Sequence, residues 1–323
     1  MAISIRKLAR QARELAPGHR ACAGCAFPSI IRIVLSVTDD PIVVVNATGC
    51  MEVVTSIYPY NAWPVTWFHS AFDNTGATIS GIEAAYKALV RKGKIPADKK
   101  IRFVVFAGDG GTYDIGLQAL SGALERGHDF LYVCYDNGAY MNTGIQRSGA
   151  TPRHGATTTS PAGKVIPGKQ QRRKPLTEIV AAHDIPYAAQ ASPSHWLDLA
   201  RKAEKGLLTE GPAFLNVLSA CPPGWGFPEE KTIEISQLAV ETGFWPLYEV
   251  ENGYFRITFK PKEFKPIEEF LRAQTRFKHI LNDPKLLEDF KEDIKREWER
   301  LEFLASRPRP EGEAKPGEVA KEE

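Results

Sequence analysis

A Gly-Asp-Gly turn and an asparagine one strand further along are the residues of this chain best placed to do chemistry. Gly108-Asp109-Gly110 follows a strongly apolar run, residues 101–107, and Asn137 follows a second one, residues 130–135. Such runs predict buried parallel strands, and open α/β sheets bind their ligands at the carboxyl ends of these strands. Carboxylate, amide and backbone carbonyl oxygens form a shell suited to Mg²⁺ that holds a diphosphate.

The glycines around Asp109 support the same interpretation. Gly108, Gly110 and Gly111 let the backbone come close to phosphate oxygens, and the N-terminus of the following helical pattern favours an anion. A lone Gly-Asp-Gly would be a common strand-to-helix turn. With Asn137 at this distance and after its own strand, the spacing resembles the thiamine-diphosphate motif of the decarboxylase and 2-oxoacid oxidoreductase superfamily. We therefore predict thiamine diphosphate as a cofactor.

Four of the five cysteines fall on predicted loops at the same end of the sheet. Cys22 and Cys25 form a Cys-x-x-Cys pair ahead of a helical run, whereas Cys50 and Cys221 each follow an apolar strand. Cys134 lies inside a strand, so it is interpreted as a small buried core residue. The other four thiolates are expected on the side of the sheet where the diphosphate should lie.

Four thiolates fit either a structural Zn²⁺ or an iron–sulfur cluster, since both accept tetrahedral sets of sulfur ligands. Zinc ribbons usually use two close cysteine pairs on local hairpins, whereas two of these cysteines are lone and distant in the sequence. A disulfide framework is not expected, because no signal peptide is visible and the chain is large enough to form a core. The residues themselves leave zinc and iron–sulfur open.

Four segments carry a wider resemblance: residues 18–25 (GHRACAGC), 47–52 (ATGCME), 108–112 (GDGGT) and 136–144 (DNGAYMNTG). Together they resemble the β subunit of pyruvate:ferredoxin oxidoreductase and its relatives in the 2-oxoacid:ferredoxin oxidoreductase family. The likeness runs from about residue 15 to about residue 300. It is specific, because cluster and cofactor signatures occur in one chain in the expected order.

The resemblance implies roles for particular residues. One [4Fe-4S] cluster would be held by four cysteines: Cys22, Cys25, Cys50 and Cys221. Mg²⁺ would be held by Asp109, Asn137 and the carbonyl of Ala139, and Asn142 would lie beside the thiazolium ring as a catalytic residue. Contacts to thiamine diphosphate are expected from a surrounding set: Cys50, Gly108, Asp109, Gly110, Gly111, Asn137, Gly138, Ala139, Tyr140, Met141 and Asn142. One departure is Ala26-Phe27-Pro28, where some relatives carry polar or acidic residues near the cofactor.

The implied activity is oxidative decarboxylation of a 2-oxoacid, with pyruvate as the first expectation and oxalate, 2-oxoisovalerate and 2-oxoglutarate left open. Electrons would pass to the cluster and then to ferredoxin, and coenzyme A would take the acyl group. Two alternatives of other classes remain. One is a non-redox thiamine enzyme whose cysteines bind structural zinc, and the other is a non-catalytic assembly subunit that retains the fold.

Half of the expected active site is missing from this chain. Thiamine diphosphate needs a carboxylate at its aminopyrimidine for proton transfer, and in this superfamily that carboxylate comes from a second, pyrimidine-binding domain. The chain has length for one such domain, and it lacks a ferredoxin-like C-x2-C-x2-C-x3-C run. We therefore expect a hetero-oligomer with a pyrimidine-domain subunit and a ferredoxin-like cluster subunit as partners.

Composition narrows the class of protein. The 323 residues are 43% hydrophobic, which is ample for one large α/β domain, and the formal charge of +2 implies neither nucleic acid nor an anionic membrane as a partner. No apolar run approaches the ~18 residues of a membrane span. Unoxidised cysteines with cluster spacing point to the cytoplasm.

Strands and helices are predicted to alternate, which gives a mostly parallel sheet with helices on both faces. The resemblance implies that this sheet is a thiamine-diphosphate-binding fold of the diphosphate-binding type. The expected strands are 42–46, 101–107, 130–136, 185–190 and 213–219, and the expected helices are 75–92, 113–126, 176–183, 194–209 and 286–304. We divide the chain into a cofactor- and cluster-binding domain (1–222), an extension that packs on this domain and on partner subunits (223–305), and a disordered tail (306–323).

Two irregular segments are assigned to the site and to the partner. Residues 142–175 lack periodicity and begin at the proposed thiazolium contact, so they are predicted to cover the active site. Residues 222–262 are rich in proline and aromatic side chains, and Trp225 and Phe227 are predicted to contact a partner.

Other polar residues are given structural interpretations. The basic run 169–174 (KQQRRK) is predicted to be a solvated loop, although phosphates of coenzyme A or an acidic ferredoxin are an alternative. His69 is predicted to be a hydrogen-bonded structural histidine rather than a catalytic acid or base. Glu83 is assigned to one face of its helix. Glu52, by contrast, follows Cys50 closely and is a candidate contact to the cofactor.

Overall fold

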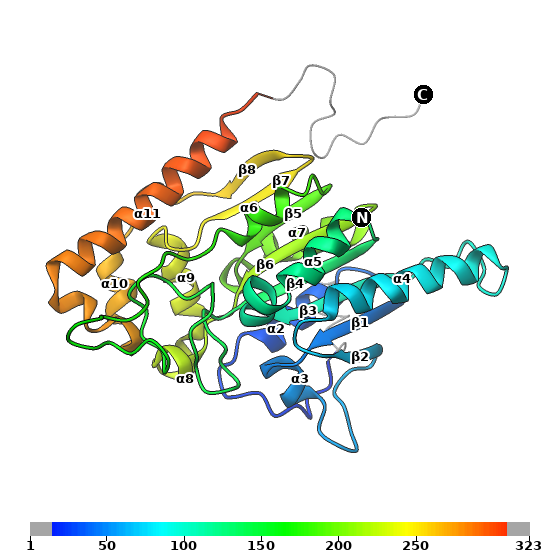
Figure 1. The fold of residues 1–323 in the computed structure, drawn as a ribbon, viewed down its shortest axis with the longest axis horizontal. Coiled ribbons are helices and arrows are strands. Elements are labelled where there is room, and N and C mark those ends of the chain that lie inside the picture. The colour runs from blue at the N-terminus through cyan, green and yellow to red at the C-terminus, as the bar shows by residue number, and fades with distance from the viewer. Residues whose placement is uncertain (1–14, 309–323) are drawn as a thin grey trace.

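The apolar runs of the sequence form the centre of one sheet. The computed structural model describes residues 15–308, and within them eight strands pair in the order β2-β1-β3-β4-β6-β5-β7-β8 (Figure 1). The first six strands of this order are parallel, and β7 and β8 are antiparallel to their neighbours. The strands are β1 (Ile42–Ala47), β2 (Thr66–Ser70), β3 (Arg102–Gly108), β4 (Phe130–Asp136), β5 (Tyr187–Ala191), β6 (Pro212–Leu218), β7 (Leu247–Glu251) and β8 (Tyr254–Phe259).

Helices cover both faces of the sheet, as the alternation predicted. Every residue of β4 and β6 is buried, because these central strands have apolar cover on both sides. One core contains side chains of α2 (Phe27–Leu35) and α7 (Trp196–Leu208), and the other contains side chains of α4 (Thr75–Arg91), α5 (Leu117–Glu125) and α6 (Leu176–Ala181). The predicted mostly parallel α/β sheet is therefore confirmed.

Three strands were not predicted. β2 is a short edge strand with three exposed residues among its five, so it lacks the apolar run that marks a central strand. β7 and β8 form an antiparallel hairpin that extends the sheet beyond β5. Both lie in the proline- and aromatic-rich segment 222–262, whose composition does not resemble that of the parallel strands.

The C-terminal part of the chain builds a third apolar core. It includes α8 (Pro222–Trp225), α9 (Thr232–Glu241), α10 (Ile267–Arg272) and α11 (Pro284–Ala305), the last of which confirms the helix predicted at 286–304. Trp225 and Phe227 are only 1% and 8% exposed, so the prediction that they form a partner contact is wrong: they pack inside the chain. The predicted tail lies outside the described residues from 309 onward.

The helix expected at 113–126 begins earlier and with a different geometry. A π-helical turn runs from Gly110 to Ile115 and is followed by α5. π-Turns inserted next to α-helices are frequent at functional sites, and this one follows directly after Asp109.

Short 3₁₀ turns connect other elements: Pro193–His195, Glu229–Lys231, Thr275–Phe277 and Ile280–Asn282. A further helix, α3 (Cys50–Thr55), follows β1. Among the described residues, none of the helices is both long and apolar enough to cross a membrane.

Candidate cofactor and metal site

The Gly-Asp-Gly turn and the asparagine lie side by side. β3 and β4 are hydrogen-bonded neighbours, with Gly108 paired to Tyr135, so the residues that follow each strand emerge at the same edge of the sheet. The backbone N–H of Asn137 donates to Asp109 Oδ1 at 3.2 Å. Strand adjacency thus brings together the two side chains that the sequence singled out.

The Asp109 carboxylate, the Asn137 amide and the Ala139 carbonyl meet at this edge. One terminal atom of the Asn137 amide lies 2.9 Å from Asp109 Oδ1 and 2.8 Å from the carbonyl oxygen of Ala139, where an NH₂ group would donate to both. Acceptors this close repel one another unless the amide turns to present its NH₂ group or a cation lies among them. Carboxylate, amide and carbonyl oxygens are the ligand types that Mg²⁺ prefers. The donor set therefore fits a magnesium ion.

Asp109 is completely buried beside a second acid. Burial raises the pKa of Asp109 well above its usual range, and the nearby Asp136 carboxylate raises it further. The hydroxyl of Ser148 donates to Asp109 Oδ2 at 2.5 Å, which favours the ionised form. A bound divalent cation would act in the same direction as Ser148 and hold Asp109 as a carboxylate.

Glycines are required at one position in the Gly-Asp-Gly turn and at one position in the loop that follows β4. A Cβ atom at Gly110 would lie 2.4 Å from the ring of Tyr140, so no side chain fits there. Gly138 has φ of +74°, in the region that glycine adopts without strain, and it carries the loop from Asn137 to Ala139. These two glycines let the loops that carry Asp109 and Asn137 approach each other closely.

A cleft lies over the turn and contains most of the predicted cofactor contacts. Those lining it are Cys50, Gly108, Asp109, Gly110, Gly111, Asn137, Ala139, Tyr140, Met141 and Asn142, together with Thr48, Gly49, Phe72, Tyr135 and Thr143. Gly138 lies between two lining residues without lining the cleft itself. Asn142 is exposed, so the predicted catalytic asparagine is open to a group arriving from outside the chain.

Four cysteines line one neighbouring cavity of about 300 Å³: Cys22, Cys25, Cys50 and Cys221. Cys50, Asn137, Met141 and Asn142 line both this cavity and the cofactor cleft, so the two spaces adjoin. Cys134 is fully buried within β4 and takes no part in either.

Cys25, Cys50 and Cys221 are partly shielded from water, whereas Cys22 is exposed. Burial raises the pKa of both Cys25 and Cys50 to about 12, and the neighbouring Cys221 contributes in the same direction. Metal binding requires thiolates, so a metal group would have to displace these protons. In the described part of the chain, no three His, Cys, Asp or Glu side chains converge closely enough to hold a single metal ion.

A buried polar network supports the metal-binding loop from behind. Asp136, the last residue of β4, accepts a hydrogen bond from the backbone N–H of Gly138 at 3.0 Å through Oδ1. Its Oδ2 accepts one from Tyr113 at 2.6 Å and pairs with Arg173 at 3.2 Å. Asn216 of β6 donates to the Tyr113 hydroxyl at 2.8 Å. This network fixes the backbone that leads into Asn137.

The prediction of a solvated loop for the basic run 169–174 is wrong for two of its residues. Lys169 is 2% exposed and donates to the carbonyls of Gly149 and Thr151 at 3.2 and 2.7 Å. Arg173 pairs with Asp136, as described above, and its guanidinium lies 4.2 Å from the centre of the Trp245 ring. The run therefore ties residues 148–151, and with them Ser148, to the sheet.

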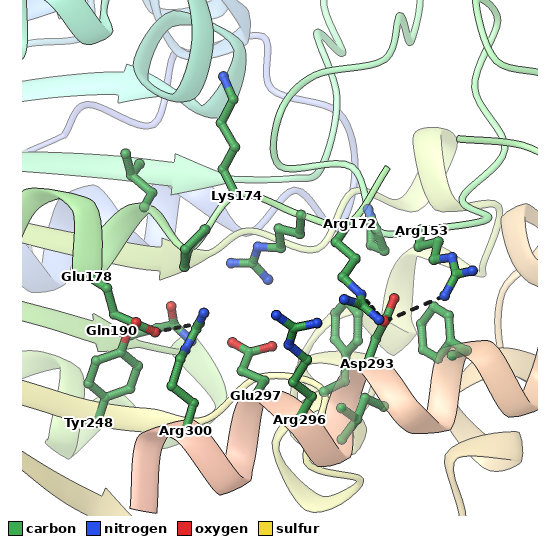
Figure 2. Close-up of a pocket in the computed structure, with 17 residues that line it drawn as sticks. Arg153, Arg172, Lys174, Glu178, Gln190, Tyr248, Asp293, Arg296, Glu297 and Arg300 are labelled. Carbon is green, nitrogen blue, oxygen red and sulfur yellow. Dashed lines mark hydrogen bonds and ion pairs between the residues drawn. The ribbon is translucent and has the colours of Figure 1, made fainter. Parts of the chain in front are cut away.

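Residues 172–174 of the same run border a charged cavity of about 270 Å³ against α11. Figure 2 shows Arg153 and Arg172 directed at Asp293, and Glu178 paired with Arg300. These pairs are partly exposed, with 44% of the Arg172 side chain open to solvent. Arg172 and Arg173 thus line the same cavity, but the Arg173 side chain is only 15% exposed and pairs with a buried carboxylate.

The structural interpretations of His69 and Glu83 agree with their contacts. His69 Nε2 is 2.8 Å from the hydroxyl of Thr48. Glu83 is buried on α4 and pairs with Lys87 and with His128, the latter at 2.9 Å. Glu52 accepts a hydrogen bond from Ser56.

Sequence reasoning missed the residues that support this site from behind and that were not singled out as site residues. Asp136 could have been found, because an acidic residue at the end of a fully apolar run must be buried and partnered. Ser148, Lys169 and Arg173 carry no such signal, since each depends on groups far away in the sequence.

Comparison with known proteins assigns the family. The thiamine pyrophosphate enzyme, C-terminal TPP binding domain matches residues 47–217. The chain is 53% identical to pyruvate synthase subunit PorB of Thermotoga maritima, over 93% of this chain and 96% of that protein. The chain belongs to the 2-oxoacid:ferredoxin oxidoreductase family. It is a subunit of an oxidoreductase, and its central domain is of the thiamine-diphosphate-binding type.

The further relatives of this oxidoreductase subunit are named for pyruvate and for other 2-oxoacids. This chain is 57% identical to pyruvate synthase subunit PorB of Methanocaldococcus jannaschii, over 83% of this chain and 90% of that protein. It is 48% identical to ketoisovalerate oxidoreductase subunit VorB of Pyrococcus abyssi, over 89% and 92%. A solved structure of 2-oxoglutarate:ferredoxin oxidoreductase from Magnetococcus marinus shares the fold, with a TM-score of 0.54 at 18% identity, over 70% of this chain and 80% of that one.

Proposed function

We propose that this chain is the thiamine-diphosphate- and cluster-binding subunit of a pyruvate:ferredoxin oxidoreductase, which oxidatively decarboxylates pyruvate and transfers the acyl group to coenzyme A. One observation carries the proposal. A cleft where the Asp109 carboxylate, the Asn137 amide and the Ala139 carbonyl meet adjoins a cavity lined by four cysteines. A cofactor that releases electrons and a group that accepts them would then be neighbours.

Mg²⁺ would be held by Asp109, Asn137 and the Ala139 carbonyl, and the diphosphate would lie over Gly108–Gly111. Bound thiamine diphosphate supplies an electron sink for the decarboxylation. This chain's part is to orient the cofactor and to exclude water from it. Asn142, open to solvent at the rim of the cleft, is proposed to contact the thiazolium end.

A [4Fe-4S] cluster bound by Cys22, Cys25, Cys50 and Cys221 is favoured over structural zinc. Zinc–sulfur bonds of ~2.3 Å would bring four sulfurs to within ~4 Å of one another around one ion. The cysteines instead surround a cavity, and no three of them converge on one point within residues 15–308. In a cluster each thiolate binds a different iron, so wider spacing is tolerated.

A partner subunit is proposed to supply the pyrimidine half of the site, and a ferredoxin-like subunit to carry electrons onward to ferredoxin. The cleft contains groups suited to the diphosphate end of the cofactor, and its rim at Asn142 is exposed. We also propose a cytoplasmic location, because the cysteines need a reducing compartment to stay free.

One experiment separates the proposal from its alternatives. The chain is purified anaerobically with its co-purifying subunits, and iron, sulfide, zinc and thiamine are measured for wild type, Asp109→Ala and the exposed control Asp98→Ala. Asp109→Ala should lose thiamine diphosphate and keep its iron, whereas Asp98→Ala should match wild type. Zinc without sulfide would favour the non-redox enzyme, and the absence of thiamine diphosphate from the complete complex would favour an assembly subunit.

The dependence on partners is tested by activity. Reduction of a viologen with pyruvate, coenzyme A, thiamine diphosphate and Mg²⁺ is measured for the chain alone and with its subunits. Substantial reduction by the chain alone would refute the half-site argument.

A second candidate substrate is 2-oxoisovalerate, because a ketoisovalerate oxidoreductase subunit is nearly as similar to this chain as the pyruvate synthase subunits are. The same assay with pyruvate, 2-oxoisovalerate, 2-oxoglutarate and oxalate ranks them by kcat/KM. A preference for 2-oxoisovalerate over pyruvate would replace the substrate and leave the cofactor assignments in place.

A further inference from the structure

Arg276 is a buried cation packed against α8, the helix that follows Cys221. It lies in the 3₁₀ turn Thr275–Phe277, and its side chain is sandwiched between aromatic rings, with the guanidinium carbon 3.7 Å from the Trp225 ring centre and 4.6 Å from that of Phe277. Only 7% of the residue is exposed. No pattern in the sequence predicts this burial.

The hydrogen-bonding capacity of Arg276 is largely unused. Its Nε donates to Gln274 at 2.7 Å, and its Nη2 is buried without a partner. Nη1 faces the backbone of Gly138, where a Cβ atom would lie 3.1 Å away. Among residues 15–308, no carboxylate comes within ion-pairing distance of Arg276. Burial of a charge without a counter-charge is strongly unfavourable, so an arginine in this place requires a negative charge from outside the described contacts.

The negative groups near Arg276 can be compared one by one. Asp136 already pairs with Arg173 at 3.2 Å. Asp109 belongs to the proposed magnesium site, where a dication would neutralise it. Cys221 starts the turn that ends at Trp225, whose backbone N–H donates to the Cys221 carbonyl at 2.8 Å, so the residue that Arg276 stacks on is tied to this ligand position. Burial lowers the pKa of Arg276 to about 9, and Asp136 and Cys221 oppose that effect, which leaves Arg276 cationic at neutral pH.

We propose that the guanidinium of Arg276 offsets the negative charge of the iron–sulfur cluster held by Cys221 and the other three cysteines. Arg276 would thereby make the cluster easier to reduce. This inference rests on the proposed function. Reduction adds one electron, and hence one negative charge, to the cluster. A fixed positive charge held in a medium of low polarity stabilises the reduced form more than the oxidised form.

The test is a redox titration of this cluster in the whole complex, followed by electron paramagnetic resonance. Arg276→Met removes the charge and keeps much of the side-chain volume, Arg276→Lys keeps the charge, and Arg272→Met removes an exposed arginine four residues earlier as a control. The signal that belongs to this chain is the one lost in Cys221→Ser. Iron and sulfide are measured for each variant.

Arg276→Met should shift the reduction potential of this cluster to a more negative value at unchanged iron content, Arg276→Lys should reverse most of the shift, and Arg272→Met should cause none. An unchanged potential in Arg276→Met with full iron content would overturn the inference. If the Met variant loses the cluster and the Lys variant retains it, a positive charge is needed for binding, which also supports the inference. Loss in both variants would assign Arg276 a packing role and overturn it. A wild-type complex without iron would refute the proposed function itself.

Discussion

Replacement of Arg173 by methionine tests whether the basic run is part of the buried framework of the site. The Arg173 side chain is 15% exposed and pairs with Asp136, which is 4% exposed. The neighbouring Arg172 is 44% exposed and pairs with Asp293 at the edge of the cavity in Figure 2. The two arginines differ by one position in sequence and strongly in burial, so Arg172→Met is a matched control.

The expected effects follow from the environment of each pair. Removal of one partner from a buried pair costs about 3–5 kcal/mol, because the other charge stays buried and alone. Loss of an exposed pair costs about 0–1 kcal/mol. At about 2.1 cal/mol/K per residue, the unfolding entropy of the whole chain is ~0.7 kcal/mol/K. Arg173→Met should therefore lower Tm by about 4–7 °C, and Arg172→Met by about 1 °C or less.

The assay is thermal unfolding of the anaerobically purified protein at one protein concentration and one cofactor concentration. The double variant Arg173→Met/Asp136→Asn should recover part of the loss, because it removes the charge that Arg173→Met leaves buried. Equal Tm values for Arg173→Met and Arg172→Met would refute the reasoning.

Three further predictions concern single side chains. Burial lowers the pKa of Lys169 to about 8, whereas a lysine in the unfolded chain keeps its proton to higher pH. As the pH rises from about 8 to 10, the free energy of unfolding of wild type should therefore increase by up to ~3 kcal/mol relative to that of Lys169→Met. Parallel Tm curves of the two proteins over this range would contradict that linkage. Ser148→Ala removes the donor that orients Asp109 and should weaken Mg²⁺-dependent binding of thiamine diphosphate about 10- to 100-fold in a calorimetric titration, whereas an unchanged affinity would show that the hydroxyl is dispensable. Cys221→Ser should abolish or damage the iron site while Cys134→Ser keeps wild-type iron content, and equal iron loss in both would overturn the choice of ligands.

The central part of the site could be predicted because it depends on neighbouring elements. β3 and β4 are consecutive parallel strands joined through one helical crossover, so their carboxyl ends had to lie together, and Asp109 with them beside Asn137. The burial of Cys134 followed in the same way from its place inside an apolar run. The cysteines were expected at this end of the sheet for the same reason, and the cavity brings four of them together.

The parts that could not be predicted depend on distant groups. A run of basic residues resembles a solvated loop unless the carbonyls of Gly149 and Thr151 and the carboxylate of Asp136 are known to face it. The edge strand β2 and the β7–β8 hairpin have mixed polarity, so their pattern does not separate them from loops. Trp225 was assigned to a surface because aromatic residues are common at interfaces, yet its indole Nε1–H donates to the Asn137 carbonyl at 2.6 Å inside the chain.

The cysteine-lined cavity has a consequence for the order in which this protein matures. Chains are synthesised from the N-terminus at ~5–20 residues per second and can begin to fold during synthesis. The oxygen-bearing loops after β3 and β4 are complete once residue 139 has been made, and Ser148 follows soon afterwards. The cavity needs Cys221, which stands after β6, and β6 must insert between β4 and β5 before its end is in place. The oxygen-bearing loops and the cysteine-lined cavity therefore become available at different times during synthesis. The group that the four thiols bind must be delivered to a chain whose sheet is already largely paired.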